Sequence, residues 1–322
     1  MDVKKAIIMA AGLGTRLIPY SKEMPKEMLP LYFFDKGSVI LKPVLQVIFE
    51  QLYDAGIREF CFIVGKNKRH VEDHFTPDWD FVDYLEDNNK SELAHLLKDF
   101  YEKIESSLIV WVNQPKPIGT GDAVYRAKKF VGDSVFMALA GDNLFLGRNI
   151  FMDILGIYDK YKENIMVVKE VEEPEKYGII RYEKTQEEDI LKVLDVIEKP
   201  KKPPSNLANV SIYVFHSEIF KFIENIEVSP RGEKEITDAL RILAKRNNLY
   251  AYIARDIYWI DIGTPKTYLE ALITSLNVIL SKEEGDFASL AKELLRKTLE
   301  TSPLPGTHHS AQTTEDRTSE IK

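Results

Sequence analysis

The first half of the chain alternates short apolar runs with longer segments of helical periodicity, and this alternation restricts the fold more than any other feature. Apolar runs without polar alternation are typical of strands buried on both faces of a parallel sheet and covered by helices. We expect such strands at 4–10, 58–64, 107–113 and 135–140. Helices are expected between them at 42–55, 90–105 and 119–130, where apolar side chains recur every three or four residues. The pattern predicts an α/β fold with a mixed, mostly parallel central sheet flanked by helices.

From Ile165 onward the apolar runs become shorter and follow one another closely, with turn residues between them. The runs IMVVKEV, YGIIRY, KVLDVIEKP and NVSIYVF predict a small β-rich region. Further helices are expected at 216–226, 234–246 and 265–280, and further strands at 249–254 and 258–263. The chain is therefore predicted to contain one domain over 1–280, followed by a helix over 281–300. The last segment, 301–322, lacks apolar periodicity and is predicted to be a disordered tail.

Composition excludes several classes of partner. The formal net charge of −8 argues against a general nucleic-acid surface, so any phosphate site must use a few placed cations. Charged residues interrupt every apolar run well short of the roughly 18 residues that a membrane helix needs, and no secretory signal is expected at the start. Cys61 is the single cysteine, which excludes disulfides within the chain and suits a reducing cytoplasm. We expect a buried structural thiol, because nothing near it would lower its pKa.

Two glycines follow the first predicted strand in AIIMAAGLGTR, where their missing Cβ atoms allow backbone N–H groups to approach a ligand. Gly12 and Gly14 therefore predict a cradle for a phosphate or a base, although a plain strand-to-helix turn has the same appearance. A dinucleotide-binding motif needs a third glycine where Leu17 stands, and no Gly-Lys-Ser/Thr follows, so neither that motif nor a P-loop is present. Arg16 and Lys26 flank the turn, and prolines frame Lys26 in PKEMLP, so we expect two placed positive charges.

Two aspartates follow predicted strands, each beside a glycine. Asp142 lies in ALAGDN and Asp261 in YWIDIGTP. Open α/β sheets bind ligands at the carboxyl ends of their strands, and Mg²⁺ prefers paired carboxylate oxygens with room for water and phosphate. Either residue alone is also a common turn or cap residue. His70 and His74 in HVEDH share a helix face, but the segment lacks the HExxH pattern and no metal site is expected there.

GLGTR followed by PKEMLP resembles the signature of the sugar-1-phosphate nucleotidylyltransferases. PKEMLP, the segment TPDWDFVDYLEDNNKSELAHLLKDF and the stretch PSNLANVSIYVF are similar, more narrowly, to the bacterial-type UTP–glucose-1-phosphate uridylyltransferases of that family. RGEKEITDAL and YWIDIGTP also resemble the related thymidylyltransferases, and YFFDKGSVIL is an insertion to which we assign no role. The resemblance covers residues 4 to 280 or so. It implies a Rossmann-like nucleotidyltransferase fold (GT-A-like), with a nucleotide side over about 1–145 and a β-rich sugar-binding side over about 165–260.

The resemblance also implies roles for particular residues. Arg16 and Lys26 would be catalytic, and Asp142 and Asp261 would bind Mg²⁺. The nucleotide-binding residues would be Ala11, Gly12, Gly14, Gln114 and Gly119, and the sugar-phosphate-binding residues Gly178, Glu198, Lys199, Asn209 and Val210. Within these sets, the Gln114 amide would offer the base a donor and an acceptor, Glu198 would bind glucose hydroxyls, and Lys199 would bind the phosphate.

The expected reaction makes UDP-glucose and pyrophosphate from UTP and glucose 1-phosphate by Mg²⁺-assisted in-line displacement. Bringing these anions together is unfavourable, since at about 4 Å and an effective dielectric constant of about 20 each pair of unit charges costs about 4 kcal/mol. Placed cations are therefore required. No general base is needed, because the sugar phosphate has a second pKa of about 6 and is already largely ionised at neutral pH.

Three alternatives remain open at this point. The first keeps the chemistry but uses dTTP or another sugar 1-phosphate, and the second is a catalytically dead regulatory relative of the same fold. The third is a nicotinamide-dependent oxidoreductase, which Leu17 and Arg16 disfavour. The expected partners are small-molecule substrates, with no nucleic acid and no membrane, and the protein is expected to be a cytoplasmic homo-oligomer, a dimer or a tetramer.

Overall fold

The computed structural model describes residues 2–35, 38–66, 68–229 and 232–282, together with 289, 292, 293 and 296. The chain divides into two compact units, Met1–Val278 and Ile279–Lys322. The tail expected at 301–322 and most of the helix expected at 281–300 lie outside the described residues. All the site residues lie in the first unit, and the assignment of 1–280 to one catalytic domain stays a prediction.

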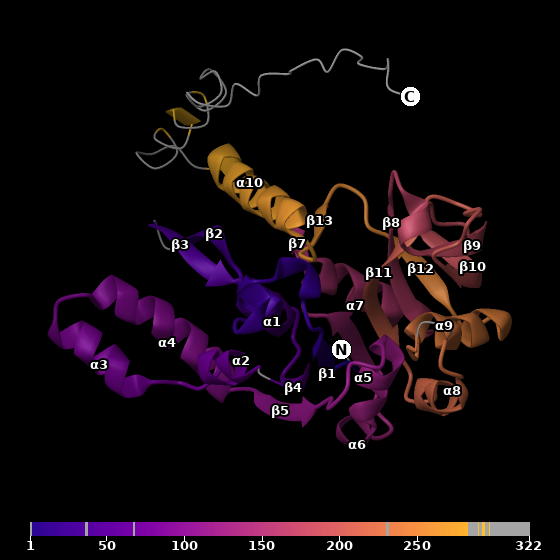
Figure 1. The fold of residues 1–322 in the computed structure, drawn as a ribbon, viewed down its shortest axis with the longest axis horizontal. Helices are drawn as coiled ribbons and strands as arrows, with labels where there is room; N and C mark the ends of the chain where they lie inside the picture. Colours follow the sequence, from indigo (N-terminus) through magenta and orange to yellow (C-terminus); the bar gives the residue numbers. More distant parts are fainter. Residues whose placement is uncertain are drawn as a thin grey trace, which may run out of the picture. The chain divides into compact units, whose positions relative to one another are not determined.

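A nine-stranded sheet forms the centre of the first unit (Figure 1). In spatial order its strands are β5 (Leu108–Asn113), β4 (Glu59–Val64), β1 (Lys5–Ala10), β6 (Phe136–Ala140), β11 (Leu207–Phe215), β8 (Ile165–Glu170), β12 (Tyr250–Ile253), β10 (Ile190–Glu198) and β9 (Gly178–Lys184). The four strands expected in the first half of the chain are β1, β4, β5 and β6. They pair in parallel, as predicted.

Successive side chains of the parallel strands face two different layers of helices. Ile8 of β1 belongs to one core, which also contains residues of α1 (Val44–Asp54), α4 (Ser91–Glu105) and α7 (Ile150–Tyr161). Ile7 belongs to a second core, together with residues of α5 (Thr120–Arg126), α6 (Lys128–Val131), α8 (Ile219–Asn225) and α9 (Ile236–Lys245). The helices expected between the strands are confirmed, with 119–130 forming two short helices. α7 is not among the helices expected from the sequence.

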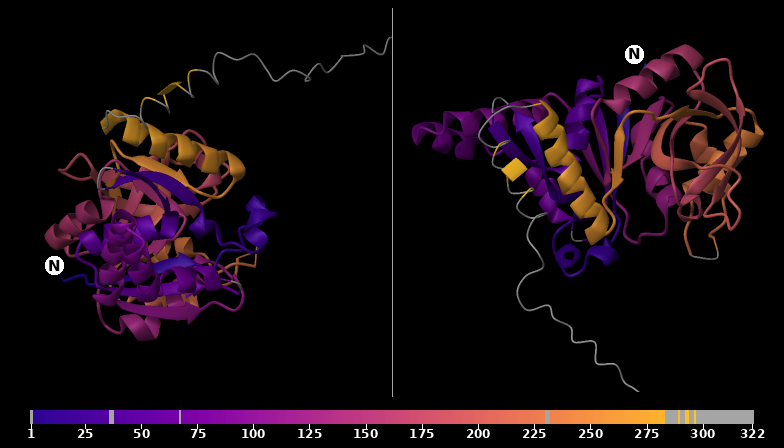
Figure 2. Two further views of the ribbon diagram at one scale, coloured as in Figure 1. Left: turned by 90° about the vertical axis from the view of Figure 1, so that its left-hand side faces the viewer. Right: turned by 90° about the horizontal axis from the view of Figure 1, so that it is seen from above.

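The expectation of a mostly parallel sheet is wrong for the second half of the chain. Of the nine strand pairings in the large sheet, four are parallel and five are antiparallel. β9 also pairs with β11, and this pairing closes β11, β8, β12, β10 and β9 into a small barrel. For β9 and β10 the reason is connection length: only 185–189 join these paired strands, whereas a parallel crossover needs a dozen residues or more. The predicted β-rich region is this barrel (Figures 1 and 2).

Two small sheets complete the strands. β7 (Asn143–Leu146) and β13 (Tyr258–Asp261) pair antiparallel, which places the end of β13 opposite the start of β7. β2 (Pro30–Asp35) and β3 (Ser38–Pro43) form a hairpin that accounts for the YFFDKGSVIL insertion. The helix expected at 265–280 is α10 (Pro265–Lys282).

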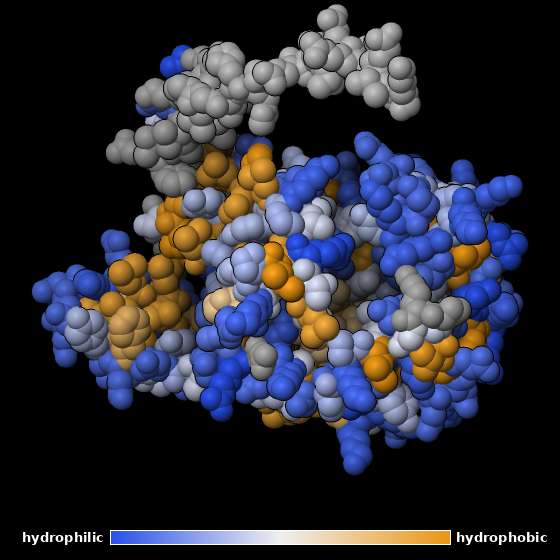
Figure 3. Space-filling model, in the orientation of Figure 1, coloured by the Kyte–Doolittle hydropathy of each residue, from blue (hydrophilic) through white to orange (hydrophobic). Residues whose placement is uncertain are grey.

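The described residues between β4 and β5 form α2 (Arg69–His74), α3 (Trp79–Asp87) and α4. α3 and α4 pair as a hairpin that projects from the sheet (Figures 1 and 2). Figure 3 shows apolar side chains on this hairpin, and Phe81, Tyr84 and Leu93 are among the exposed ones. The hairpin carries none of the predicted site residues. No described helix combines the length and apolar character needed to cross a membrane.

Candidate functional site

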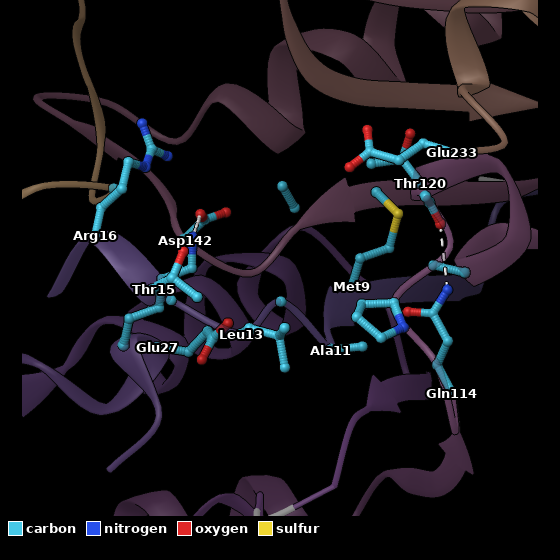
Figure 4. Close-up of a pocket in the computed structure, with 18 of the residues that line it drawn as sticks. Met9, Ala11, Leu13, Thr15, Arg16, Glu27, Gln114, Thr120, Asp142 and Glu233 are labelled. Atoms are coloured by element: carbon cyan, nitrogen blue, oxygen red, sulfur yellow. Dashed lines mark hydrogen bonds and ion pairs between the residues drawn. The ribbon is translucent and has the colours of Figure 1, made fainter. Parts of the chain in front are cut away.

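The glycine turn lies where β1 leaves the sheet. Gly14 has a φ of 62°, a left-handed conformation that favours glycine. The N–H of Leu17 donates to the carbonyl of Gly14 at 2.9 Å and closes a 3₁₀ turn. The Leu17 side chain is buried in the core, so the position of the missing third glycine serves packing instead of ligand contact. Arg16 precedes it and lines a cavity beside the turn (Figure 4).

Lys26 and Asp142 form an ion pair at the strand ends. Lys26 begins a 3₁₀ turn (Lys26–Met28), and Asp142 follows β6. The Nζ of Lys26 donates to Oδ2 of Asp142, and the two side chains are only 12% and 16% exposed. Burial disfavours the charged ammonium, but the carboxylates of Asp142 and Glu27 outweigh burial and raise the pKa of Lys26.

Asp261 lies beside Asp142 because β13 pairs with β7. The N–H of Ile262 donates to the carbonyl of Asp142 at 3.1 Å. Burial first, and then the negative charge of Asp142, raise the pKa of Asp261. Arg16 is close to Asp261: a Cβ built on Gly263 would lie 2.6 Å from a guanidinium nitrogen of Arg16 and 3.4 Å from Oδ1 of Asp261. Arg16, Lys26 and Asp142 line one end of the cavity, and Asp261 lies beside them.

A second ion pair supports the first, and the sequence analysis does not predict it. Glu27 is 1% exposed and accepts a hydrogen bond of 2.7 Å from Nζ of Lys68, which is 8% exposed. Burial raises the pKa of Glu27, and the nearby charges of Lys68 and Lys26 oppose the rise. The pair ties the turn that carries Lys26 to the residue preceding α2. No local pattern joins these two residues, because 41 positions separate them.

At the other end of the cavity, Gln114 follows β5 and is 4% exposed. Its Nε2 donates to the carbonyl of Gly119 at 3.2 Å and to the carboxylate of Asp122 at 2.8 Å. Both partners are acceptors, so the amide nitrogen must face them and both of its protons are used. The expectation that the amide of Gln114 offers a ligand a donor is therefore wrong, whereas the acceptor role of its carbonyl oxygen stays a prediction.

Gly119 fits against a segment from the second half of the chain. Its φ is 113°, and an added Cβ would lie 2.7 Å from the nitrogen of Lys234 and 2.8 Å from its carbonyl carbon. Two backbone hydrogen bonds hold this approach, from Lys234 N to Ile118 O at 2.7 Å and from Gly121 N to Lys234 O at 2.8 Å. A side chain at position 119 would push these segments apart.

A cavity of about 410 Å³ joins the two ends (Figure 4). It brings together all the residues predicted for the nucleotide and for catalysis, and one of the two predicted metal residues, namely Ala11, Gly12, Gly14, Arg16, Lys26, Gln114, Gly119 and Asp142. Asp261 is not part of the lining, whereas Gly263, two residues further on, is. Its lining also includes residues that the sequence analysis does not predict, among them Glu27, Thr120, Glu233 and Glu235. In the described part of the chain, no group of three His, Cys, Asp or Glu side chains is arranged to hold a metal. What the predicted metal residues, Asp142 and Asp261, offer a cation is a pair of neighbouring carboxylates.

The predicted sugar residues gather on the barrel. Gly178 of β9 lies opposite Glu198 of β10, and a Cβ on Gly178 would lie 3.1 Å from Oε2 of Glu198 and 3.7 Å from Cβ of Asn209. Lys199 has a φ of 44°, and its Nζ lies 3.7 Å from Oε1 of Glu198. Glu198 and Lys199 line a second cavity of about 900 Å³ and not the first one, whereas Glu235 lines both.

Asn209 and Val210 mainly shape the backbone of β11. The side chain of Asn209 donates to the hydroxyl of Tyr213 at 2.7 Å and accepts from the N–H of Ser211 at 3.0 Å. Val210 is fully buried, and its carbonyl accepts from Nδ2 of Asn143 at 2.7 Å. Their contact with a sugar ring stays a prediction.

Two further expectations concern residues away from the cavity. Cys61 is fully buried, and burial raises the pKa of its thiol to about 12, so the predicted structural thiol is confirmed. His70 is exposed, whereas His74 packs at 5.1 Å from the ring of Phe100 and hydrogen-bonds Oε1 of Gln46 at 3.0 Å. The two histidines therefore lie in different environments, His70 in solvent and His74 against the core.

Comparison with known proteins places the chain in a family. The nucleotidyl transferase family model matches residues 5–277. A UTP–glucose-1-phosphate uridylyltransferase of Bacillus subtilis is 38% identical over 255 residues, which cover 78% of this chain and 83% of the relative. A solved UDP-glucose pyrophosphorylase complexed with UDP-glucose is 32% identical, with a TM-score of 0.73 and coverage of 84% of this chain and 98% of the other. A UTP-bound UGPase from Acinetobacter baumannii is 26% identical, with a TM-score of 0.78 and coverage of 92% and 99%.

These relatives confirm the resemblance that the glycine turn and PKEMLP carry. The matched regions cover most of each relative as well as most of this chain. The likeness is therefore not confined to one half of the chain. The chain belongs to the nucleotidyl transferase family.

Proposed function

We propose that this chain is a UTP–glucose-1-phosphate uridylyltransferase, which makes UDP-glucose and pyrophosphate. A phosphate oxygen of glucose 1-phosphate bonds to the α-phosphorus of UTP, and the bond from that phosphorus to the β-phosphate bridge breaks. One observation carries the proposal: Arg16, Lys26 and Asp142, with Asp261 beside them, lie at one end of a cavity whose other end is lined by Gln114. The names of the relatives supply the substrates.

In this proposal the base end selects a pyrimidine. The carbonyl oxygen of Gln114 accepts the N3–H of uracil, because the amide nitrogen is already bonded to Gly119 and Asp122. Backbone N–H groups at Ala11 and Gly12 serve the ring carbonyls and the phosphates, since nothing on Gly12 obstructs them. The glycine turn through Gly14 keeps those groups exposed.

The phosphate end supplies positive charge. Arg16 and Lys26 bind the phosphates of UTP and stabilise the leaving pyrophosphate, whose charge grows as the bond breaks. Asp142 and Asp261 fit a divalent cation of the hard type, because they form a half-buried pair of carboxylates whose mutual repulsion a cation would relieve. Mg²⁺ is the ion we propose, and when bound it would neutralise phosphate charge.

The barrel binds the sugar phosphate. Glu198 accepts hydrogen bonds from glucose hydroxyls, and Gly178 leaves room for the ring beside that carboxylate. Lys199 attracts the phosphate, and the backbone around Asn209 and Val210 completes the sugar side. The nucleotide side over about 1–145 and the sugar side over about 165–260 thus belong to one catalytic domain over 1–280. A cytoplasmic homo-oligomer remains our expectation.

The experiment is a substrate panel on the purified chain. UTP, dTTP, CTP, ATP and GTP are each mixed with glucose 1-phosphate and Mg²⁺, and pyrophosphate release is measured. We expect UTP to give the highest kcat/KM, with UDP-glucose formed in equal amount to pyrophosphate. Equal turnover of dTTP would favour the thymidylyl alternative. No pyrophosphate with any nucleotide would favour either another sugar 1-phosphate or a regulatory relative.

A further inference from the structure

The segment 234–237, which leads into α9, lies between the two cavities. Its amino-terminal side is bonded to the loop at the base end of the first cavity. Lys234 exchanges backbone hydrogen bonds of 2.7 and 2.8 Å with Ile118 and Gly121, and the N–H of Ile236 donates to Oγ1 of Thr120 at 3.2 Å. Three hydrogen bonds therefore hold segment 234–237 against the loop that contains Gly119.

The carboxyl-terminal side of the same segment reaches the barrel. Thr237 is 3% exposed, and its hydroxyl donates to Oε2 of Glu198 at 2.9 Å. Gly178 lies over this bond, since a Cβ there would be 3.1 Å from Oε2 of Glu198 and 3.6 Å from Oγ1 of Thr237. The absence of a side chain at 178 thus leaves the bonded carboxylate accessible from above.

We propose that Thr237 is a positioning residue that aims the Glu198 carboxylate and sets its place relative to the base-binding loop. The inference rests on the proposed function, in which Glu198 binds glucose hydroxyls. Only two residues lie between Lys234, bonded to the base-end loop, and Thr237, bonded to Glu198. A displacement of one end of so short a segment is passed to the other, because its backbone bonds leave little freedom.

The chemistry explains why a hydroxyl is needed at this position. A hydrogen bond to an ionised carboxylate is stronger than one between neutral groups and fixes the rotation of the carboxyl group. Without it, Glu198 retains the attraction of Lys199, whose Nζ lies 3.7 Å from the other oxygen. The carboxylate then turns toward Lys199, which weakens hydroxyl binding and occupies the cation expected to meet the sugar phosphate.

The test compares variants of Thr237 in the full chain. Thr237→Val keeps the volume and removes the donor, Thr237→Ala removes both, and Thr237→Ser keeps the hydroxyl. We expect both Thr237→Val and Thr237→Ala to raise the KM for glucose 1-phosphate about tenfold, while the KM for UTP changes less than twofold. Thr237→Ser should restore the wild-type value to within about threefold. Ser205→Ala, which removes a barrel hydroxyl bonded to the carbonyl of Ile180 at 2.7 Å, is the matched control.

A double-mutant cycle with Glu198→Ala, which removes the acceptor that Thr237 bonds, separates positioning from a general loss of stability. If Thr237 acts through Glu198, adding Thr237→Val to Glu198→Ala should change the KM for glucose 1-phosphate less than twofold. Full additivity of the two changes overturns the proposal, as does an equal rise of both KM values in Thr237→Val. If circular dichroism shows that Thr237→Val does not fold, Thr237→Ser and Thr237→Ala provide the test, and an unchanged KM for glucose 1-phosphate in Thr237→Ala overturns the proposal. The proposed function has its own test, the release of pyrophosphate by the wild-type enzyme. The role of Thr237 is judged only from variants compared with an active wild type, so the two proposals can fail independently.

Discussion

The two ends of the first cavity are built on different principles. At the phosphate end, charged side chains from distant segments, Arg16, Lys26, Asp142 and Asp261, compensate one another over the ends of the strands. At the base end the decisive contacts are made by backbone atoms, with Gly119 packed against Lys234. The first end should therefore respond to a change of charge at constant shape. The second should respond to a single added methyl group at constant charge.

The largest effect is expected for Lys26→Ala at the phosphate end. We expect kcat to fall by about 10²- to 10³-fold, because the variant removes a placed cation where charge develops as pyrophosphate leaves. Lys22→Ala, in the same loop but 78% exposed at its side chain, is the control and should keep kcat within about twofold. Kinetics should be paired with circular dichroism. If Lys26→Ala keeps the wild-type kcat and an intact fold, the claim that the phosphate end works through placed charges is wrong.

Glu27→Gln probes the support beneath the same end. The substitution keeps the shape but leaves Lys68 buried without its partner, so we expect the free energy of unfolding to fall by about 3 kcal/mol. Chemical denaturation measures this. Glu23→Gln, whose side chain is 72% exposed beside Lys22, should change it by less than about 0.5 kcal/mol. Adding Lys68→Met to Glu27→Gln should recover most of the loss, and failure to recover would mean that the pair is not the cause.

Gly119→Ala addresses the base end. We expect a loss of about 2 kcal/mol in unfolding free energy and a rise in the KM for UTP, because the new Cβ meets the backbone of Lys234 and the φ of 113° disfavours alanine. Gly147→Ala is a closely matched control, since Gly147 has a φ of 112° and, among the described residues beyond its two chain neighbours, no atom lies within 4 Å of an added Cβ. It carries the backbone strain without the clash. Equal effects in both variants would show that backbone strain, and not contact with Lys234, explains the base end.

The same contrast explains what the sequence could predict. Charged residues next to glycines and prolines, such as Arg16, Lys26 and Asp142, have local signals, and the parallel strands that carry them follow from apolar runs. The closed barrel, the Glu27–Lys68 pair and the contact between Gly119 and Lys234 depend on segments far apart in the chain, for which no local periodicity exists. Gln114 falls between the two cases, because its residue type predicts an amide but only the position of Asp122 reveals which half of the amide is used.

The smallest effect concerns His74, which lies outside the first cavity. It is the loss of unfolding free energy as the pH falls. Burial lowers the pKa of His74 to about 4, below the value of about 6.5 expected in the unfolded chain. Above pH 6.5 or so neither state binds this proton, and as pH falls toward 4 the unfolded state binds more of it, so stability is lost on acidification. We expect His74→Gln to reduce the loss of unfolding free energy between about pH 7 and 5.5 by about 1 kcal/mol, a figure discounted for partial exposure. His70→Gln, on the same helix but exposed, should leave the loss unchanged. If the two variants lose stability equally on acidification, the burial of His74 is not the cause of the loss.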